Sequence, residues 1–166
     1  MKRLLATIML CCAASTHAEQ PSLVDSMTAP WNTLVFVSTR MPQASVIELA
    51  REASQAGAVI VLTGFSDENG TLTATQKYAA QISSACCGKK PAHWIIDPVL
   101  TRRYHVTAAP TFVVAHGESD DPREYSKVAG EISLAQALKF VAQTSKLPAA
   151  RDAASRVYYS AYGDKY

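Results

Sequence analysis

Two adjacent cysteines, Cys86 and Cys87, are the most reactive side chains in the body of this sequence. Neighbouring cysteines can close only a small, strained ring, so the pair could form a vicinal disulfide or a mixed disulfide with another protein. The apolar spacing around them predicts that Cys86 lies on the inner face of a helix, where a cysteine commonly serves as a small buried hydrophobic side chain. Thiol chemistry and simple core packing therefore both remain open.

The other side chains that could do chemistry do not form recognisable sets. His93, His105 and His116 fall on three different predicted elements and lack the spacing of metal ligands. The sequence has no Gly-rich phosphate loop, and neither a Ser-His-Asp set nor a pair of carboxylates stands in a catalytic context. We therefore expect no metal site, no cofactor and no catalytic residue.

Residues 1–18 have the features of a cleavable export signal. Lys2 and Arg3 precede an apolar run. The small residues Thr16 and Ala18 then stand at the two positions before the expected cut that require small side chains. The run is about half the ~20 residues that a membrane-spanning helix needs, and no later segment is longer. We therefore expect cleavage near Ala18 and an exported chain without a membrane span after signal removal.

Removal of the signal changes the charge balance. The whole chain has 16 Lys and Arg against 14 Asp and Glu, and the signal takes Lys2 and Arg3 with it, which leaves 14 of each. A neutral chain without a basic run has no electrostatic basis for binding nucleic acid. We therefore expect protein partners rather than DNA or RNA.

The predicted elements form one α/β domain over residues 32–147, after a flexible segment at 19–31. Buried strands at 33–38 and 58–63 flank a helix between Pro42 and Gly57, which is a parallel βαβ unit with a right-handed crossover. The remaining elements are helices at 72–86, 97–104 and 134–141 and strands at 94–96, 111–114 and 125–128, the last two as an antiparallel pair. The predicted order is β-α-β-α-β-α-β-β-α.

The chain resembles the TrbC family of F-type conjugative transfer (type IV secretion) systems, in the thioredoxin-like superfamily. The resemblance spans about residues 32–145. It is carried by Val35-Phe36-Val37-Ser38 with Met41-Pro42, by Ala109-Pro110-Thr111-Phe112, and by Gly130-Glu131-Ile132-Ser133-Leu134. It implies a three-layer α/β/α fold with a central mixed sheet, and a periplasmic protein that helps to assemble the conjugative pilus. It also implies other apparatus proteins as partners, among them a TraW-like protein supplied in trans.

The chain departs from thioredoxins at the loop after the first strand, where those enzymes carry Cys-x-x-Cys. Here Met41 and Ala44 stand near the two cysteine positions. A thioether cannot form a thiolate, so disulfide exchange at this loop is excluded. We therefore expect a non-enzymatic assembly factor that acts through protein contacts. The alternatives are a divergent thiol oxidoreductase or isomerase that uses Cys86 and Cys87, and a peptide-binding chaperone.

Two regions could hold a partner. The resemblance implies a cis bond before Pro110 and a peptide-binding role for Met41, Pro42, Ala109 and Pro110, although a proline that merely starts a strand would fit as well. The second region is the tail at 148–166, whose side chains include Tyr158, Tyr159, Tyr162 and Tyr166. Tyrosines of this kind dock a partner, pack back on the domain or lie disordered.

Overall fold

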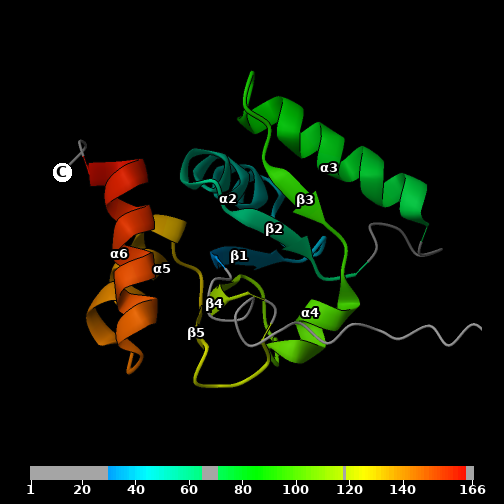
Figure 1. Cartoon of the computed structure of the whole chain (residues 1–166). Helices are drawn as coiled ribbons and strands as arrows, with labels where there is room; N and C mark the ends of the chain where they lie inside the picture. The colour runs from blue at the N-terminus through cyan, green and yellow to red at the C-terminus, as the bar shows by residue number, and fades with distance from the viewer. Residues whose placement is uncertain (1–29, 65–70, 118, 164–166) are drawn as a thin grey trace, which may run out of the picture.

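The computed structural model describes residues 30–64, 71–117 and 119–163 (Figure 1). The predicted signal peptide, residues 19–29 of the predicted flexible segment and Tyr166 lie outside the described residues. Within the described part, no helix is both long and apolar enough to cross a membrane.

The central sheet has five strands in the order β3-β2-β1-β4-β5. They are β1 (Trp31–Val37), β2 (Val59–Leu62), β3 (His93–Ile95), β4 (Thr111–His116) and β5 (Tyr125–Ala129). The first three are parallel, whereas β4 runs antiparallel to β1 and pairs with β5 as a hairpin. The predicted βαβ unit and antiparallel hairpin are confirmed, and β1 and β3 each begin one to two residues earlier than expected.

Helices cover both faces of this mixed sheet (Figure 1). They are α2 (Gln43–Ala56), α3 (Leu72–Cys86), α4 (Pro98–Arg103), α5 (Leu134–Thr144) and α6 (Pro148–Tyr162). Val35 and Val37 of β1 face the larger cluster, which includes side chains of α2, α3, α5 and α6, and Leu34 and Phe36 face the smaller cluster with Tyr104 beside α4. These layers and the strand order are those of the thioredoxin-like α/β fold that the sequence predicted.

Local signals set the helix ends. Gly57 ends α2 in the left-handed region at φ 66°, where a residue with a side chain would be strained. The Asp97 carboxylate caps α4 by accepting from the Val99 and Leu100 amides. Ser133 and Gln136 form a capping box at the start of α5.

The predicted tail contains a helix, α6, that packs on the domain. Ala150, Ala153 and Ala154 are buried, and α6 contacts α5, α2, β1 and β4. The small alanine side chains allow close approach of the helix backbones. The structure therefore adds one helix to the predicted element order, and this helix covers the same face of the sheet as α2 and α5.

Candidate functional site

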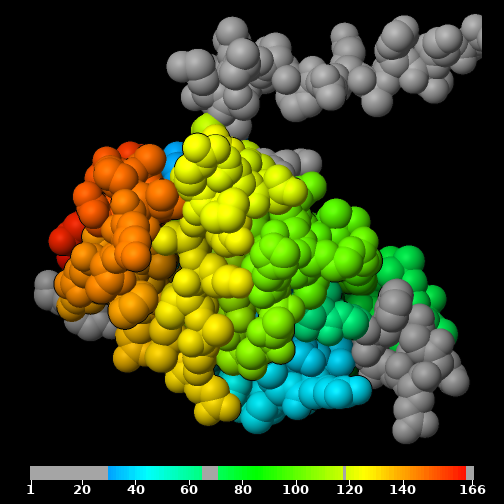
Figure 2. Space-filling model, turned by 90° about the horizontal axis from the view of Figure 1, so that it is seen from below, coloured from blue at the N-terminus to red at the C-terminus, as the bar shows by residue number. Residues whose placement is uncertain are grey.

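A groove lies where the loop between β1 and α2 meets the segments that precede β4 and α5. We call it the Pro110 groove, and its cavity volume is about 370 Å³. It is lined by Met41, Pro42, Ser45, Glu48, Leu49, Glu52, Ala109, Pro110, Glu131, Ile132 and Ser133. Figure 2 shows the start of α2 in cyan beside the gold segment that precedes α5, at one edge of the molecule. The four residues that the sequence analysis grouped there, from Met41 to Pro110, thus line one cavity.

The β1–α2 loop contributes to the lining of the groove and forms a short turn. The Met41 amide donates to the Ser38 carbonyl at 3.1 Å, and the Ser38 amide donates to Met41 Sδ at 3.4 Å. Met41 is half-buried and packs against the main core. Pro42 is the N-cap of α2. The turn therefore presents a thioether and a proline ring, neither of which can exchange a disulfide.

Another part of the lining is the Ala109–Pro110 peptide, which is cis as the resemblance implied. The Pro110 carbonyl accepts from the Gly130 amide at 3.1 Å. Within the described residues, the N–H and C=O of Ala109 have no hydrogen-bond partner. Ala109 therefore offers one donor and one acceptor that an extended chain in the groove could use.

Three carboxylates line the groove, and the sequence analysis did not identify them as site residues. Glu52 accepts from the Leu134 amide at 2.5 Å and from the Ala135 amide, at the start of α5. Burial nevertheless raises the pKa of Glu52, because desolvation outweighs these two bonds. Glu48 pairs with Arg51, and Glu131 is exposed with no ion-pair partner in the described chain.

Tyr158, Tyr159 and Tyr162, the tyrosines of the tail that the structure describes, do not share one exposed face. Tyr162 is 5% exposed, and its Oη donates to the Glu52 carbonyl at 3.3 Å. Tyr158 is half-buried with its ring 5.4 Å from that of Tyr159 and 5.8 Å from that of Tyr162. Only Tyr159, at 71% exposure, projects fully into solvent among these three. Of these three described tyrosines, two pack on the domain and one ring is exposed.

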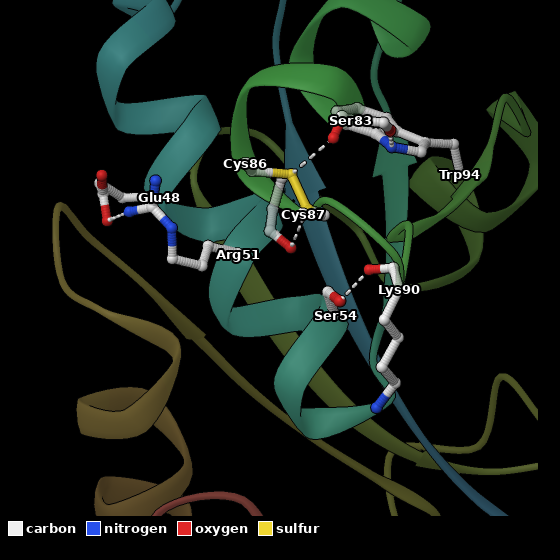
Figure 3. The surroundings of a disulfide bond; sticks show 9 residues. Glu48, Arg51, Ser54, Ser83, Cys86, Cys87, Lys90 and Trp94 are labelled. Carbon is white, nitrogen blue, oxygen red and sulfur yellow. Dashed lines mark hydrogen bonds and ion pairs between the residues drawn. A yellow bond between two sulfur atoms is a disulfide. The ribbon is translucent and has the colours of Figure 1, made fainter.

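Cys86 and Cys87 form a vicinal disulfide at the end of α3 (Figure 3). Both residues are half-buried against the main core, so Cys86 is not the fully buried side chain that core packing alone would give. Cys87 Sγ lies 3.5 Å from the Ala50 carbonyl oxygen of α2, and Cys86 Sγ lies 3.6 Å from that of Ser83. These are contacts rather than hydrogen bonds, because a disulfide sulfur carries no proton. Neither cysteine lines the Pro110 groove.

The described residues hold no group of three or more His, Cys, Asp or Glu side chains that could bind a metal ion. His93 is exposed on β3, His105 follows α4, and His116 ends β4, where it stacks on Trp31 with ring centroids 5.3 Å apart. The three histidines therefore lie at separate places in the fold.

Comparison with known proteins gives one family match. A family model described as "Type-F conjugative transfer system pilin assembly protein" matches residues 35–141. None of the curated proteins matches the chain. Among solved structures, the chain is similar to a secreted Mycobacterium tuberculosis disulfide oxidoreductase homologous to E. coli DsbE. The identity is 17%, the match covers 76% of this chain and 79% of that chain, and the TM-score is 0.41.

Proposed function

Because the chain belongs to the TrbC family of type-F conjugative transfer pilin assembly proteins, we propose that it assists pilus assembly in the periplasm by binding a partner protein in the Pro110 groove. Family membership supports the assembly role. The groove supports the mode of action, since it combines an apolar lining with open backbone groups. The partner that the family resemblance suggests is a TraW-like protein.

One observation carries the non-catalytic part of the proposal. Met41 stands in the loop between β1 and α2, and Ala44 follows in the first turn of the helix. A thiol at such a position would be activated by the helix N-terminus, but a thioether has no proton to lose. The groove therefore keeps a surface for holding an extended chain and lacks a group that could react with it.

The second candidate function is disulfide exchange through Cys86 and Cys87, and the disulfide at the end of α3 favours it. Against it stands the location of both sulfurs. They are half-buried beside α2 and outside the lining of the groove, so a chain held at Ala109 would not be presented to them. Disulfide exchange requires access of a thiolate to one of the sulfurs.

Donor transfer frequency separates these functions in a deletion strain that is complemented with variants at matched protein abundance. Ser45→Trp places a large ring in the groove from an exposed position on α2, and Gln55→Trp is the matched control on the same helix outside the groove. We expect Ser45→Trp to lower the affinity for the partner, and with it the transfer frequency, at least about tenfold, which for the affinity corresponds to about 1.4 kcal/mol of binding free energy. The control should transfer normally.

The double variant Cys86→Ser, Cys87→Ser tests the second function in the same strain. We expect normal transfer at normal abundance. If this variant lost transfer while Ser45→Trp kept it, the thiol function would replace the groove function. Photo-crosslinking from position 45 would identify the protein that binds in the Pro110 groove. Recovery of many unrelated unfolded chains, instead of one apparatus protein, would favour a chaperone.

A further inference from the structure

We propose that the Pro110 groove selects an extended partner segment that carries a lysine or arginine two positions from an apolar side chain. This inference rests on the proposed function, because it describes the partner of the same groove. It follows from three features that the groove combines: an apolar part of the lining, open backbone groups at Ala109, and the carboxylates of Glu48, Glu52 and Glu131, which we call the acidic rim.

The apolar part of the lining can hold one aliphatic side chain. Leu49 of α2 and Ile132 before α5 contribute it together with Met41. Leu49 is 5% exposed and anchored in the main core, so this part of the lining is fixed rather than adaptable. A segment whose backbone pairs with Ala109 would be extended there, and alternate side chains of an extended segment point the same way. The residue two positions along therefore faces the groove as well.

The charged part of the lining is acidic only. Glu48, Glu52 and Glu131 line the groove, and no lysine, arginine or histidine is among the lining residues. Glu52 is committed to the Leu134 and Ala135 amides, but Glu131 has no ion-pair partner in the described chain. A cation two positions from the apolar anchor would be attracted by Glu131 and Glu48, which line the same cavity, whereas an acidic segment would be repelled.

The pairing of Glu48 with Arg51 does not neutralise this rim. Both side chains are well exposed, at 65% for Glu48 and 41% for Arg51, and the pair is a local one within the same helix. Exposed pairs of this kind are weak, so a partner's cation can replace Arg51 at small cost. Residues 19–29 of the chain itself contain Glu19 and Asp25 and neither lysine nor arginine. The charge pattern thus favours another protein over this segment of a second copy.

Three synthetic peptides test the selection by titration into the isotope-labelled chain at low salt. Each has serine at the remaining positions and one leucine, with lysine, glutamate or glutamine two positions away. We expect the Ala109 and Ile132 amide signals to shift on binding. The lysine peptide should bind about five- to tenfold tighter than the glutamate peptide, because attraction of the lysine and repulsion of the glutamate each contribute about as much as one exposed ion pair. Added salt should reduce this preference.

Charge-removing variants decide whether the rim causes the preference. In Glu48→Gln with Glu131→Gln, the lysine and glutamine peptides should bind equally. The matched control, Asp120→Asn with Asp152→Asn, removes two exposed carboxylates outside the groove and should keep the preference. Equal binding of lysine and glutamate peptides to the wild type would overturn the inference, and so would a preference that survives Glu48→Gln with Glu131→Gln. If none of the three peptides bound, the inference would also be overturned. The proposed function is tested separately, by the transfer frequency of the Ser45→Trp strain.

Discussion

Replacement of Tyr162 by alanine should destabilise the whole domain, although this residue is close to the end of the chain. Tyr162 lies in the last turn of α6, is 5% exposed, and packs in the main core cluster. Its Oη donates to the Glu52 carbonyl of α2 at 3.3 Å. The ring thus connects the final helix to the helix that forms one wall of the Pro110 groove.

The expected loss can be estimated from the area that the ring buries. A buried aromatic side chain removes about 150–250 Å² from water, which at about 25 cal/mol per Å² gives about 4–6 kcal/mol as an upper bound. Large-to-small aromatic substitutions cost about 3–5 kcal/mol when measured. We therefore expect Tyr162→Ala to lower the free energy of unfolding by about 3 kcal/mol or more. Tyr162→Phe should cost only about 0.5–1 kcal/mol, since it removes one long hydrogen bond.

Urea denaturation followed by circular dichroism measures these differences, with Tyr159→Ala as the matched control. Tyr159 is in the same helix and is 71% exposed, so its replacement should cost less than about 1 kcal/mol. Equal losses for Tyr159→Ala and Tyr162→Ala would refute the reasoning. So would a Tyr162→Ala protein with an unchanged midpoint, because α6 would then contribute no stability to the domain.

Three further predictions concern Glu52, the cysteine pair, and Met41 and Ala44 at the start of α2. Burial raises the pKa of Glu52, so the folded chain binds the proton of this carboxyl group more tightly than the unfolded chain does. The wild type should therefore lose stability relative to Glu52→Gln as pH rises through the folded-state pKa. Urea midpoints measured from about pH 4 to about pH 7 would show this loss, and a slope of opposite sign would contradict it. Cys86→Ser with Cys87→Ser should change the free energy of unfolding by less than about 1 kcal/mol in the same assay, because a bridge between neighbours closes almost no loop in the unfolded chain. Met41→Cys with Ala44→Cys should form a disulfide that thiol titration detects after reduction, and failure to oxidise would show that the loop cannot bring the two sulfurs together.

Most of the fold could be predicted because its signals are local. The continuous apolar runs of β1 and β2 need burial on both faces, and Gly57, Asp97 and Ser133 each set a helix end through contacts within a few residues. The role of α6 could not be predicted in this way. Its buried face consists largely of alanines such as Ala153, which give a weak apolar signal in sequence although they allow close helix packing.

The site could be predicted only in part, for a comparable reason. The resemblance pointed to Met41 and Pro110, and the fold brings them to one cavity. The acidic rim depends on contacts between distant segments: the bond from the Leu134 amide to Glu52 spans 82 positions. The sequence shows only that Glu48 and Glu52 are four residues apart in a predicted helix, which places both side chains on the same helix face.

The acidic rim also bears on whether the loop between β1 and α2 could support thiol chemistry. A redox cysteine at the start of α2 would need its thiolate stabilised, and carboxylates nearby raise the pKa of a thiol instead. Glu48, Glu52 and Glu131 line the same cavity as Met41, so the electrostatics of the groove oppose a thiolate and favour a bound cation. For this reason we expect the thiols of Met41→Cys with Ala44→Cys to ionise at higher pH than those of thioredoxin. Neutralising Glu48 and Glu131 in that variant should lower their pKa, and a pKa that did not respond would mean that the rim is too far from the loop to act on either a thiolate or a partner's cation.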